Sequence, residues 1–148
     1  MNEAIRWQQR LENLSKALNR LREALRATAH EPTNHLYQIA LIGAFQFTFE
    51  LSWKTMKDYL VYNGVQVSLP RDVIKQAFHH QLIQDGQAWI DMLEDQNLMA
   101  HVYQEQVALT AGKSIRERYA PAIEQIHTDL RKKQGEGKAW MTAIFTSN

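Results

Sequence analysis

The sequence contains no cysteine among its 148 residues. This absence excludes disulfide bonds, thiolate metal sites and thiol nucleophiles, and it agrees with a reducing compartment. The chain also lacks an apolar run of the roughly 20 residues that a membrane-spanning helix requires. Its opening segment, MNEAIRWQQR, is charged and polar, unlike the basic stretch and apolar core of a secretory signal. We therefore expect a cytoplasmic protein with no membrane partner.

No charge of one sign dominates the chain. Lys and Arg number 17 and Asp and Glu 16, which gives a formal net charge of +1. Non-specific binding of nucleic acid is thus not favoured, and any RNA contact would need a local basic patch. The sequence also lacks a Gly-rich phosphate loop, a Gly-x-Ser-x-Gly elbow and the paired aspartates that hold magnesium in nucleotidyltransferases. Nucleotidyl transfer by this chain alone is therefore not expected.

Apolar residues at helical spacing are what the sequence does provide. A helix is predicted over Ile5–Leu25 from alternating spacings of three and four, and Pro32 marks the following turn. The stretch His35–Asn63 is apolar almost all round, which predicts a helix that is central in a bundle or covered by a second subunit. Its polar positions fall within one arc that is either a solvated stripe or the wall of a cleft: Gln46, Glu50, Lys54, Lys57 and Asp58.

Three further helical segments follow. Gly64 suits a left-handed helix end, and a short helix is predicted from Pro70 to about Ile83. Gly86–Tyr103 is predicted to be one amphipathic helix, and a last long helix follows from Gln104, with a kink or break near Tyr119–Ala120 caused by Pro121. We predict an all-α fold, an up-and-down four-helix-type bundle with an extra short helix over residues 1–134. Residues 135–148 would form a hinge and a C-terminal tail, which is either frayed or docked on a neighbouring subunit.

Metal chemistry has little support. Glu124 and His127 match one Glu-x-x-His element of a di-metal bundle, but no second copy occurs. His79 and His80 are adjacent on a helix and diverge by about 100°, so they cannot both face one ion; a surface or interface role fits them better. We predict neither a metal nor a cofactor.

The segment Gly86–Tyr103 carries the candidate site. On a helical wheel, Gln96 lies in the middle of an apolar stripe whose members are Trp89, Met92, Leu93, Met99, Ala100 and Tyr103. Asn97 and His101 share one edge of that stripe, where a His can be oriented by the protein and reached by a ligand. The alternative is that these two residues only satisfy each other or a backbone group. Leu98 and Val102 fall opposite the stripe, which suggests burial against a partner.

Three segments together, Phe45–Leu60, Leu69–Ile83 and Trp89–Tyr103, resemble the nucleotidyltransferase substrate-binding protein family, a branch of the HEPN superfamily. The resemblance implies a helical bundle that dimerises and works with a separately encoded minimal nucleotidyltransferase, often as a toxin–antitoxin pair. HEPN ribonucleases are similar in carrying Arg, usually Asn next, three more residues and then His, with Tyr two residues beyond in the subgroup paired with nucleotidyltransferases. Asn97, His101 and Tyr103 match this motif, and Gln96 takes the place of the arginine.

The resemblance also implies roles for these residues. The His of HEPN ribonucleases activates the RNA 2′-hydroxyl as a general base, and the Arg stabilises the phosphate. Gln96 can donate hydrogen bonds but brings no charge. Tyr103 matches the tyrosine that the partner adenylylates to silence the toxin; its alternative is a core tyrosine with its tip in water.

Two functional hypotheses follow, beside the possibility of a purely structural bundle. The first is a nucleotide- or substrate-binding accessory subunit, not catalytic alone, with a polar cleft at a homodimer interface. That cleft would be lined by Gln96, Asn97 and His101 and, from the preceding long helix, by Gln46, Glu50 and Lys54. The second is a metal-independent ribonuclease toxin that cleaves RNA despite Gln96 and is silenced by adenylylation of Tyr103.

Overall fold

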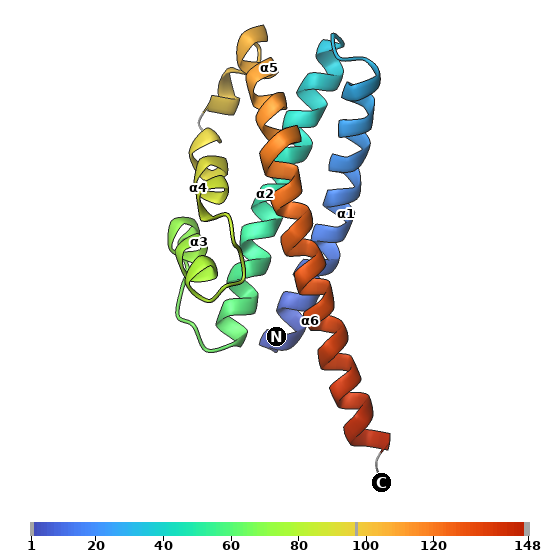
Figure 1. The fold of residues 1–148 in the computed structure, drawn as a ribbon, viewed down its shortest axis with the longest axis vertical. Helices are drawn as coiled ribbons and strands as arrows, with labels where there is room; N and C mark the ends of the chain where they lie inside the picture. Colours follow the sequence, from blue (N-terminus) through green and yellow to red (C-terminus); the bar gives the residue numbers. More distant parts are fainter. Residues whose placement is uncertain (1, 97, 147–148) are drawn as a thin grey trace.

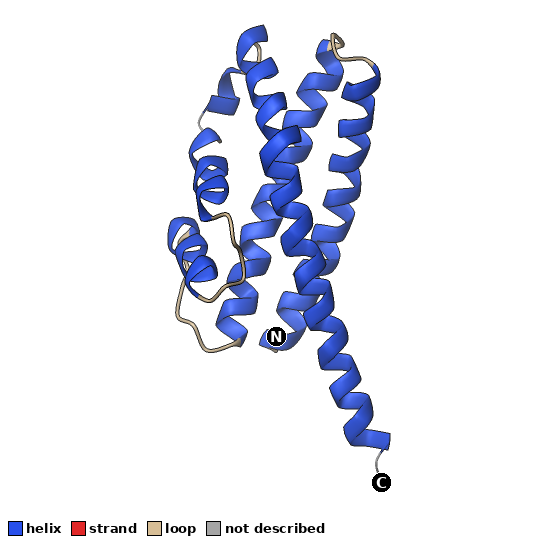
Figure 2. Cartoon of the chain, viewed as in Figure 1, coloured by secondary structure: helices blue, strands red, loops and turns tan. Residues whose placement is uncertain are grey.

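The fold is a bundle of helices that run alternately up and down (Figure 1). The computed structural model describes residues 2–96 and 98–146, with side chains for all of these except 98 and 137–146. Within this part of the chain the regular elements are all helical (Figure 2). The prediction of an all-α bundle is confirmed. No helix in the described residues is long and apolar enough to cross a membrane.

Helices α1 (Glu3–His30) and α2 (His35–Tyr62) form the first two rods. Asn2 caps α1 by accepting a hydrogen bond from the Ala4 N–H, at 2.8 Å. Every third or fourth residue of α1 is buried, as its apolar spacing predicts: Trp7, Leu11, Leu14, Ala17, Leu18 and Leu21. The helix extends beyond the apolar pattern at both ends.

The ends of α2 follow local sequence chemistry. Asn34 caps its start by accepting a hydrogen bond from the Tyr37 N–H, at 3.1 Å. After its last turn, Gly64 adopts a φ of +87°, a left-handed conformation that glycine reaches without strain. Helix α2 contacts α1, α3, α5 and α6, so it occupies the centre of the bundle.

The third rod is divided between two short helices, α3 (Pro70–His79) and α4 (Gly86–Asp95). The extra short helix predicted after Pro70 is therefore present, although it ends at His79 rather than near Ile83. Gln81, in the turn between the helices, has a φ of +61°. The 3-10 turn η1 (Leu98–His101) then leads to α5 (Glu105–Ser114).

The fourth rod changes its hydrogen-bonding pattern where Pro121 enters. The π-helical turn η2 (Ile115–Tyr119) joins α5 to α6 (Ala120–Thr146), and the Ala120 N–H donates to the Ile115 carbonyl five residues earlier. In a regular α-helix the ring of Pro121 would clash with the carbonyl of Glu117. The wider turn relieves that clash, so the rod continues as a helix at the predicted kink.

Helix α6 continues through Gly135 to Thr146, and its C-terminal part projects beyond the other helices (Figure 1). The helix therefore does not break at Gly135–Gly137, where the hinge was predicted. Glycine inside a helix costs roughly 1 kcal/mol relative to alanine, which weakens a helix without ending it. The division between a bundle domain over 1–134 and a tail over 135–148 stays a prediction.

Aromatic rings join three of the rods in the core. Phe45 and Phe49 of α2 stack at 6.0 Å between ring centroids. Tyr119 of η2 lies 5.4 Å from Phe45, and Trp89 of α4 lies 6.0 Å from Phe49. Burying such rings stabilises a fold by several kcal/mol in all. The cluster fixes α4 and η2 against α2 and so positions the segment that follows α4.

Candidate functional site

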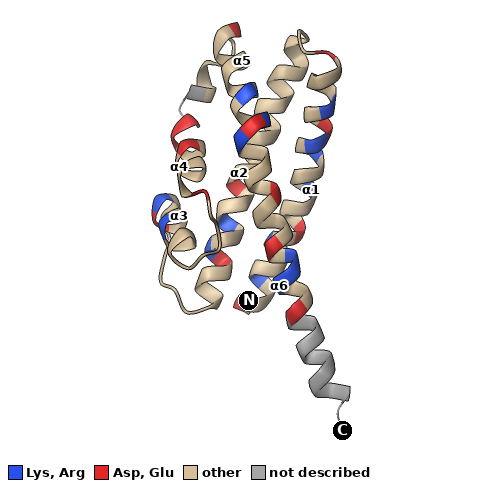
Figure 3. Ribbon diagram, viewed as in Figure 1, with Lys and Arg blue, Asp and Glu red and all other residues tan. Residues whose placement is uncertain are grey.

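The segment Gly86–Tyr103 is divided, and its prediction as one continuous helix was wrong. Helix α4 ends at Asp95, Gln96 is its C-cap, and the backbone resumes as the 3-10 turn η1. Asp91, Glu94 and Asp95 gather at the C-terminal end of α4 with no basic residue in its last turn (Figure 3). Negative charge opposes the helix dipole at that end, which disfavours further helical turns.

The break changes the positions that the helical wheel assigned. Trp89, Met92 and Met99 are buried, as predicted for the apolar stripe. Gln96 is half-buried, but Tyr103 is 76% exposed and does not share an inward face with it. Asn97 lies outside the described residues, as does the side chain of Leu98. The predicted common edge of Asn97 and His101 rested on a continuous helix, and this basis is lost.

The structure does bring His101 and Tyr103 together. Both side chains are exposed, and His101 Nδ1 lies 3.5 Å from the Tyr103 hydroxyl, with 6.0 Å between the ring centroids. Of the two alternatives for Tyr103, the core position is excluded by its exposure. The hydroxyl is therefore open to a reagent from solvent, with an imidazole beside it.

Two hollows flank this segment. One, of about 290 Å³, is bordered by Val102 and Tyr103 on one side and by His35 and Ile39 of α2 on the other. The second, of about 220 Å³, is bordered by Asp95 and Met99 and by residues of α5. A ligand seated in the first hollow would contact Tyr103 and the start of α2 at once.

A polar cluster between α4 and η2, which the sequence did not predict, holds the end of α4. Buried Tyr119 donates a short hydrogen bond to Asp95, and Arg118 pairs with Asp91 at 2.8 Å. Burial and the Asp95 carboxylate raise the pKa of Tyr119 far above its usual value, so the hydroxyl keeps its proton. Hydrogen bonds from Arg118 and Gln87 lower the pKa of Asp91. Pro121, which follows the π turn, is the sequence feature that marks this region.

The predicted polar stripe of α2 contains a local ion pair. Lys54 Nζ lies 3.1 Å from Glu50, and the Trp53 indole N–H donates to Glu50 at 3.0 Å. Gln46 is half-buried one turn before Glu50. Asp58 departs from the stripe, because it is buried and pairs with Arg10 of α1 at 2.9 Å. The role of Gln46, Glu50 and Lys54 as cleft walls stays a prediction.

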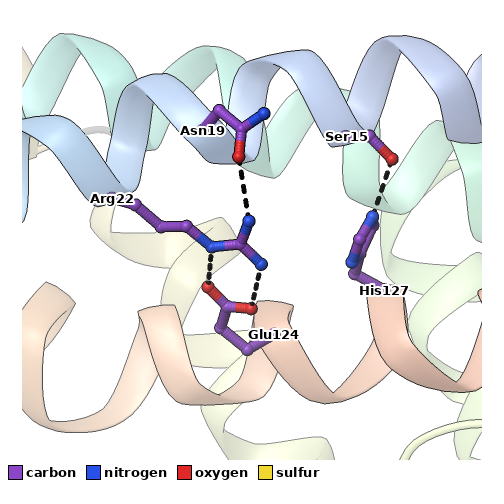
Figure 4. A network of polar contacts seen from close by, with 5 residues as sticks. All are labelled: Ser15, Asn19, Arg22, Glu124 and His127. Atoms are coloured by element: carbon purple, nitrogen blue, oxygen red, sulfur yellow. Dashed lines mark hydrogen bonds and ion pairs between the residues drawn. The ribbon is translucent and has the colours of Figure 1, made fainter.

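The Glu-x-x-His element of α6 is engaged with α1 (Figure 4). Glu124 accepts two hydrogen bonds from Arg22, both at 2.7 Å, and Asn19 accepts a third bond from the same guanidinium. His127 lies 2.7 Å from the Ser15 hydroxyl, and burial lowers its pKa. In the described part of the chain, no three His, Cys, Asp or Glu side chains gather in a way that could hold a metal ion. These two residues join helices α1 and α6.

His79 and His80 of the other histidine pair are both exposed, at the end of α3. Their rings meet edge to face with centroids 5.2 Å apart. The surface position agrees with the prediction, and an interface role remains untested.

Comparison with known proteins agrees with the fold. The model of the family described as "nucleotidyltransferase substrate binding protein like" matches residues 9–132. A crystal structure from Thermus thermophilus is 30% identical and superposes with a TM-score of 0.72, covering 80% of this chain and 98% of that one. A Haemophilus influenzae protein, whose structure is that of a substrate binding domain of a nucleotidyltransferase, is 20% identical with a TM-score of 0.71. This superposition covers 82% of this chain and 98% of the Haemophilus influenzae chain.

No curated protein matches the sequence significantly. The family match nevertheless extends over most of the bundle, from the second turn of α1 to the middle of α6. By this match, the chain belongs to the family of nucleotidyltransferase substrate binding protein-like proteins.

Proposed function

We propose that this chain is the nucleotide- or substrate-binding accessory subunit of a two-component minimal nucleotidyltransferase system, which includes the possibility of a toxin–antitoxin pair. The observation that carries the proposal is the family match over residues 9–132. A neutral Gln96 stands where the HEPN motif has a charged Arg, which favours binding over RNA cleavage. The partner would be a separately encoded nucleotidyltransferase.

The exposed pair His101 and Tyr103 supports a contact with that partner. The Tyr103 hydroxyl is open to solvent and borders the hollow beside α2, so it is a reachable acceptor for an adenylyl group. Transfer from ATP would form a bond between the Tyr103 oxygen and the α-phosphorus, with pyrophosphate leaving and the phenolic proton passing to a base or to water. Gln96, Asn97 and His101 remain the proposed lining of the substrate cleft.

An exposed face of α2 supports a homodimer. Leu36, Ile39 and Phe47 are 76%, 49% and 45% exposed, and no Lys, Arg, Asp or Glu occurs between residues 35 and 49. Farther along the same helix, Glu50 and Lys54 add one charge of each sign (Figure 3). An apolar face of this kind marks an association surface. Because its charged end carries both signs, the face can pair with a second copy of itself across a two-fold axis.

The oligomeric state is tested by sedimentation. The wild-type chain is expected near twice 17.2 kDa, and Phe47→Glu is expected to sediment as a monomer, because it places a charge in the apolar face. Leu109→Glu is the matched control, since Leu109 is 44% exposed on α5 and outside this face. A wild-type monomer at micromolar concentration would remove the shared cleft from the proposal.

The accessory role is tested by co-expression with a separately encoded minimal nucleotidyltransferase from the same genome. Stable co-purification is expected, and mass spectrometry after addition of ATP is expected to find an adenylyl group on Tyr103. Tyr62→Phe, at another exposed tyrosine, should leave the modification in place, whereas Tyr103→Phe should abolish it. Co-purification without an adduct would retain the accessory role and exclude the modification.

The alternative function is a metal-independent ribonuclease toxin silenced by adenylylation of Tyr103. His101 favours it, because an exposed imidazole is available as a general base. The test incubates the purified chain with RNA beside His101→Ala. Cleavage by the wild type that disappears in the variant would replace the accessory role with the ribonuclease.

A further inference from the structure

Helix α3 and the turn after it form a third hollow, remote from His101 and Tyr103. Its volume is about 840 Å³. Its last lining residue, Gln84, precedes α4, whereas η1 follows that helix, so the ten residues of α4, about 15 Å in length, lie between the two regions. The hollow is lined by Lys75, Phe78, His79, Gln81, Ile83 and Gln84, a set without an acidic side chain.

The aromatic ring of Phe78 packs against Gly86 on one side and is open to solvent on the other. The residue is 55% exposed. Its ring lies so close to Gly86 that a Cβ built there would be 3.2 Å from Phe78 Cδ2. The glycine therefore lets one side of the ring rest on the start of α4, while the rest of it faces the hollow. An exposed ring whose position is fixed is suited to stacking with a flat ligand, because little rotamer freedom is lost on binding.

An ammonium group, an imidazole and two amides surround this ring. Lys75 lies three residues before Phe78 and four before His79, so each of these side chains neighbours Lys75 on the helix surface, and all three line the hollow. Gln81 and Gln84 also line the hollow, and the side-chain amide of Gln84 donates to the backbone carbonyl of Gln81 at 3.3 Å. Gln81 has a φ of +61°, the left-handed conformation that ends α3, and the Leu82 N–H beyond it donates to the Ala77 carbonyl at 2.8 Å. The hollow thus combines a π-face, positive charge and adaptable hydrogen-bonding groups.

We propose that this hollow binds a mononucleotide, with its base stacked on Phe78 and its phosphate beside Lys75 and His79. Base–aromatic stacking is worth about 1–3 kcal/mol per base, and an ammonium group adds attraction for a phosphate. The amides of Gln81 and Gln84 are placed to contact the edge of the base. The site belongs to this chain alone, and its existence does not depend on the accessory role, on Tyr103 or on dimerisation.

The test titrates the purified chain with AMP, adenosine and inorganic phosphate by isothermal calorimetry. AMP is expected to bind saturably in the micromolar to millimolar range, more tightly than adenosine. Phe78→Leu keeps an apolar side chain but removes the π-face, so it should weaken AMP binding at least about fivefold. Phe78→Trp should retain binding, and its indole fluorescence should change with AMP. Lys75→Ala should weaken AMP binding and leave adenosine binding unchanged.

Tyr62→Ala is the control, because Tyr62 is 47% exposed at the end of α2 and does not line the hollow. Circular dichroism of each variant would verify the fold. Absence of saturable AMP binding to the wild type would overturn the proposal. Wild-type affinity in Phe78→Leu would do the same, and so would phosphate binding as tightly as AMP, since the base would then contribute nothing.

Discussion

The hydroxyl group of Tyr119 connects the aromatic core to the end of α4, and Tyr119→Phe removes it alone. The ring is 1% exposed and donates its hydrogen bond to the half-buried carboxylate of Asp95. Phenylalanine fills the same volume, so the stacking with Phe45 stays and no cavity forms. The substitution therefore isolates one hydrogen bond between η2 and α4.

The expected loss of stability depends on the hydrogen-bond acceptor, the carboxylate of Asp95. Hydrogen bonds to charged groups contribute about 1.5–3 kcal/mol to stability. Because Asp95 is only half-buried, water can replace part of the lost bond, and the lower value of about 1.5 kcal/mol is expected. For a chain of this length each kcal/mol corresponds to about 2–4 °C, so the melting temperature should fall by about 3–6 °C.

Urea denaturation of four proteins measures this bond: wild type, Tyr119→Phe, Asp95→Asn and the double variant. Asp95→Asn alone also removes a negative charge from the C-terminal end of a helix, which is stabilising, so the single variant mixes two effects. The double-mutant cycle removes that ambiguity and should give a coupling of about 1–2 kcal/mol. Additivity of the two variants within about 0.3 kcal/mol would refute the idea that this bond holds α4.

Three further substitutions test the core, a helix end and a half-buried histidine. Phe49→Ala should lower the free energy of unfolding by about 3–5 kcal/mol in urea, because the side chain is fully buried; the half-exposed Phe47→Ala should cost far less, and equal costs would contradict the packing. Gly64→Ala should cost about 1 kcal/mol by the same assay because of the left-handed φ, and an unchanged midpoint would count against it. Burial and Arg22 lower the pKa of His127 in the folded state, so the unfolded chain binds the proton first and stability falls as the pH drops below about 6.5. His127→Gln should flatten that decline in urea midpoints measured from about pH 7.5 to 5, and an identical pH profile would refute the assignment.

Local chemistry explains why much of the bundle could be predicted. The end of α2 is encoded by Gly64, whose conformational preference acts within a few residues. The buried positions of α1 follow from apolar spacing alone. Such features need no knowledge of distant partners, and the structure confirms them.

The end of α4 depends on partners far away in the sequence. A helical wheel assumes that the helix continues, and nothing between Trp89 and Tyr103 is a proline or glycine that would stop it. The acidic end of α4 disfavours further turns, and Tyr119, 24 residues beyond Asp95, holds it in place. Exposure of Tyr103 follows from this break, so sequence reasoning placed it on the wrong face. Only the proximity of His101 and Tyr103 could be predicted, because the two residues are two positions apart in the sequence.

Because of the π turn between Ser114 and Pro121, the fourth rod tolerates no change in its number of residues at this point. A π turn holds one residue more than the α-helical turn that it replaces, so deleting one residue there would rotate α5 by about 100° about its axis relative to α6. Ala108, which now packs in the core, would swing toward solvent. Chains of this fold can therefore lengthen or shorten the connections between rods, but an insertion or deletion in this helix would put one half of the rod out of phase with the other.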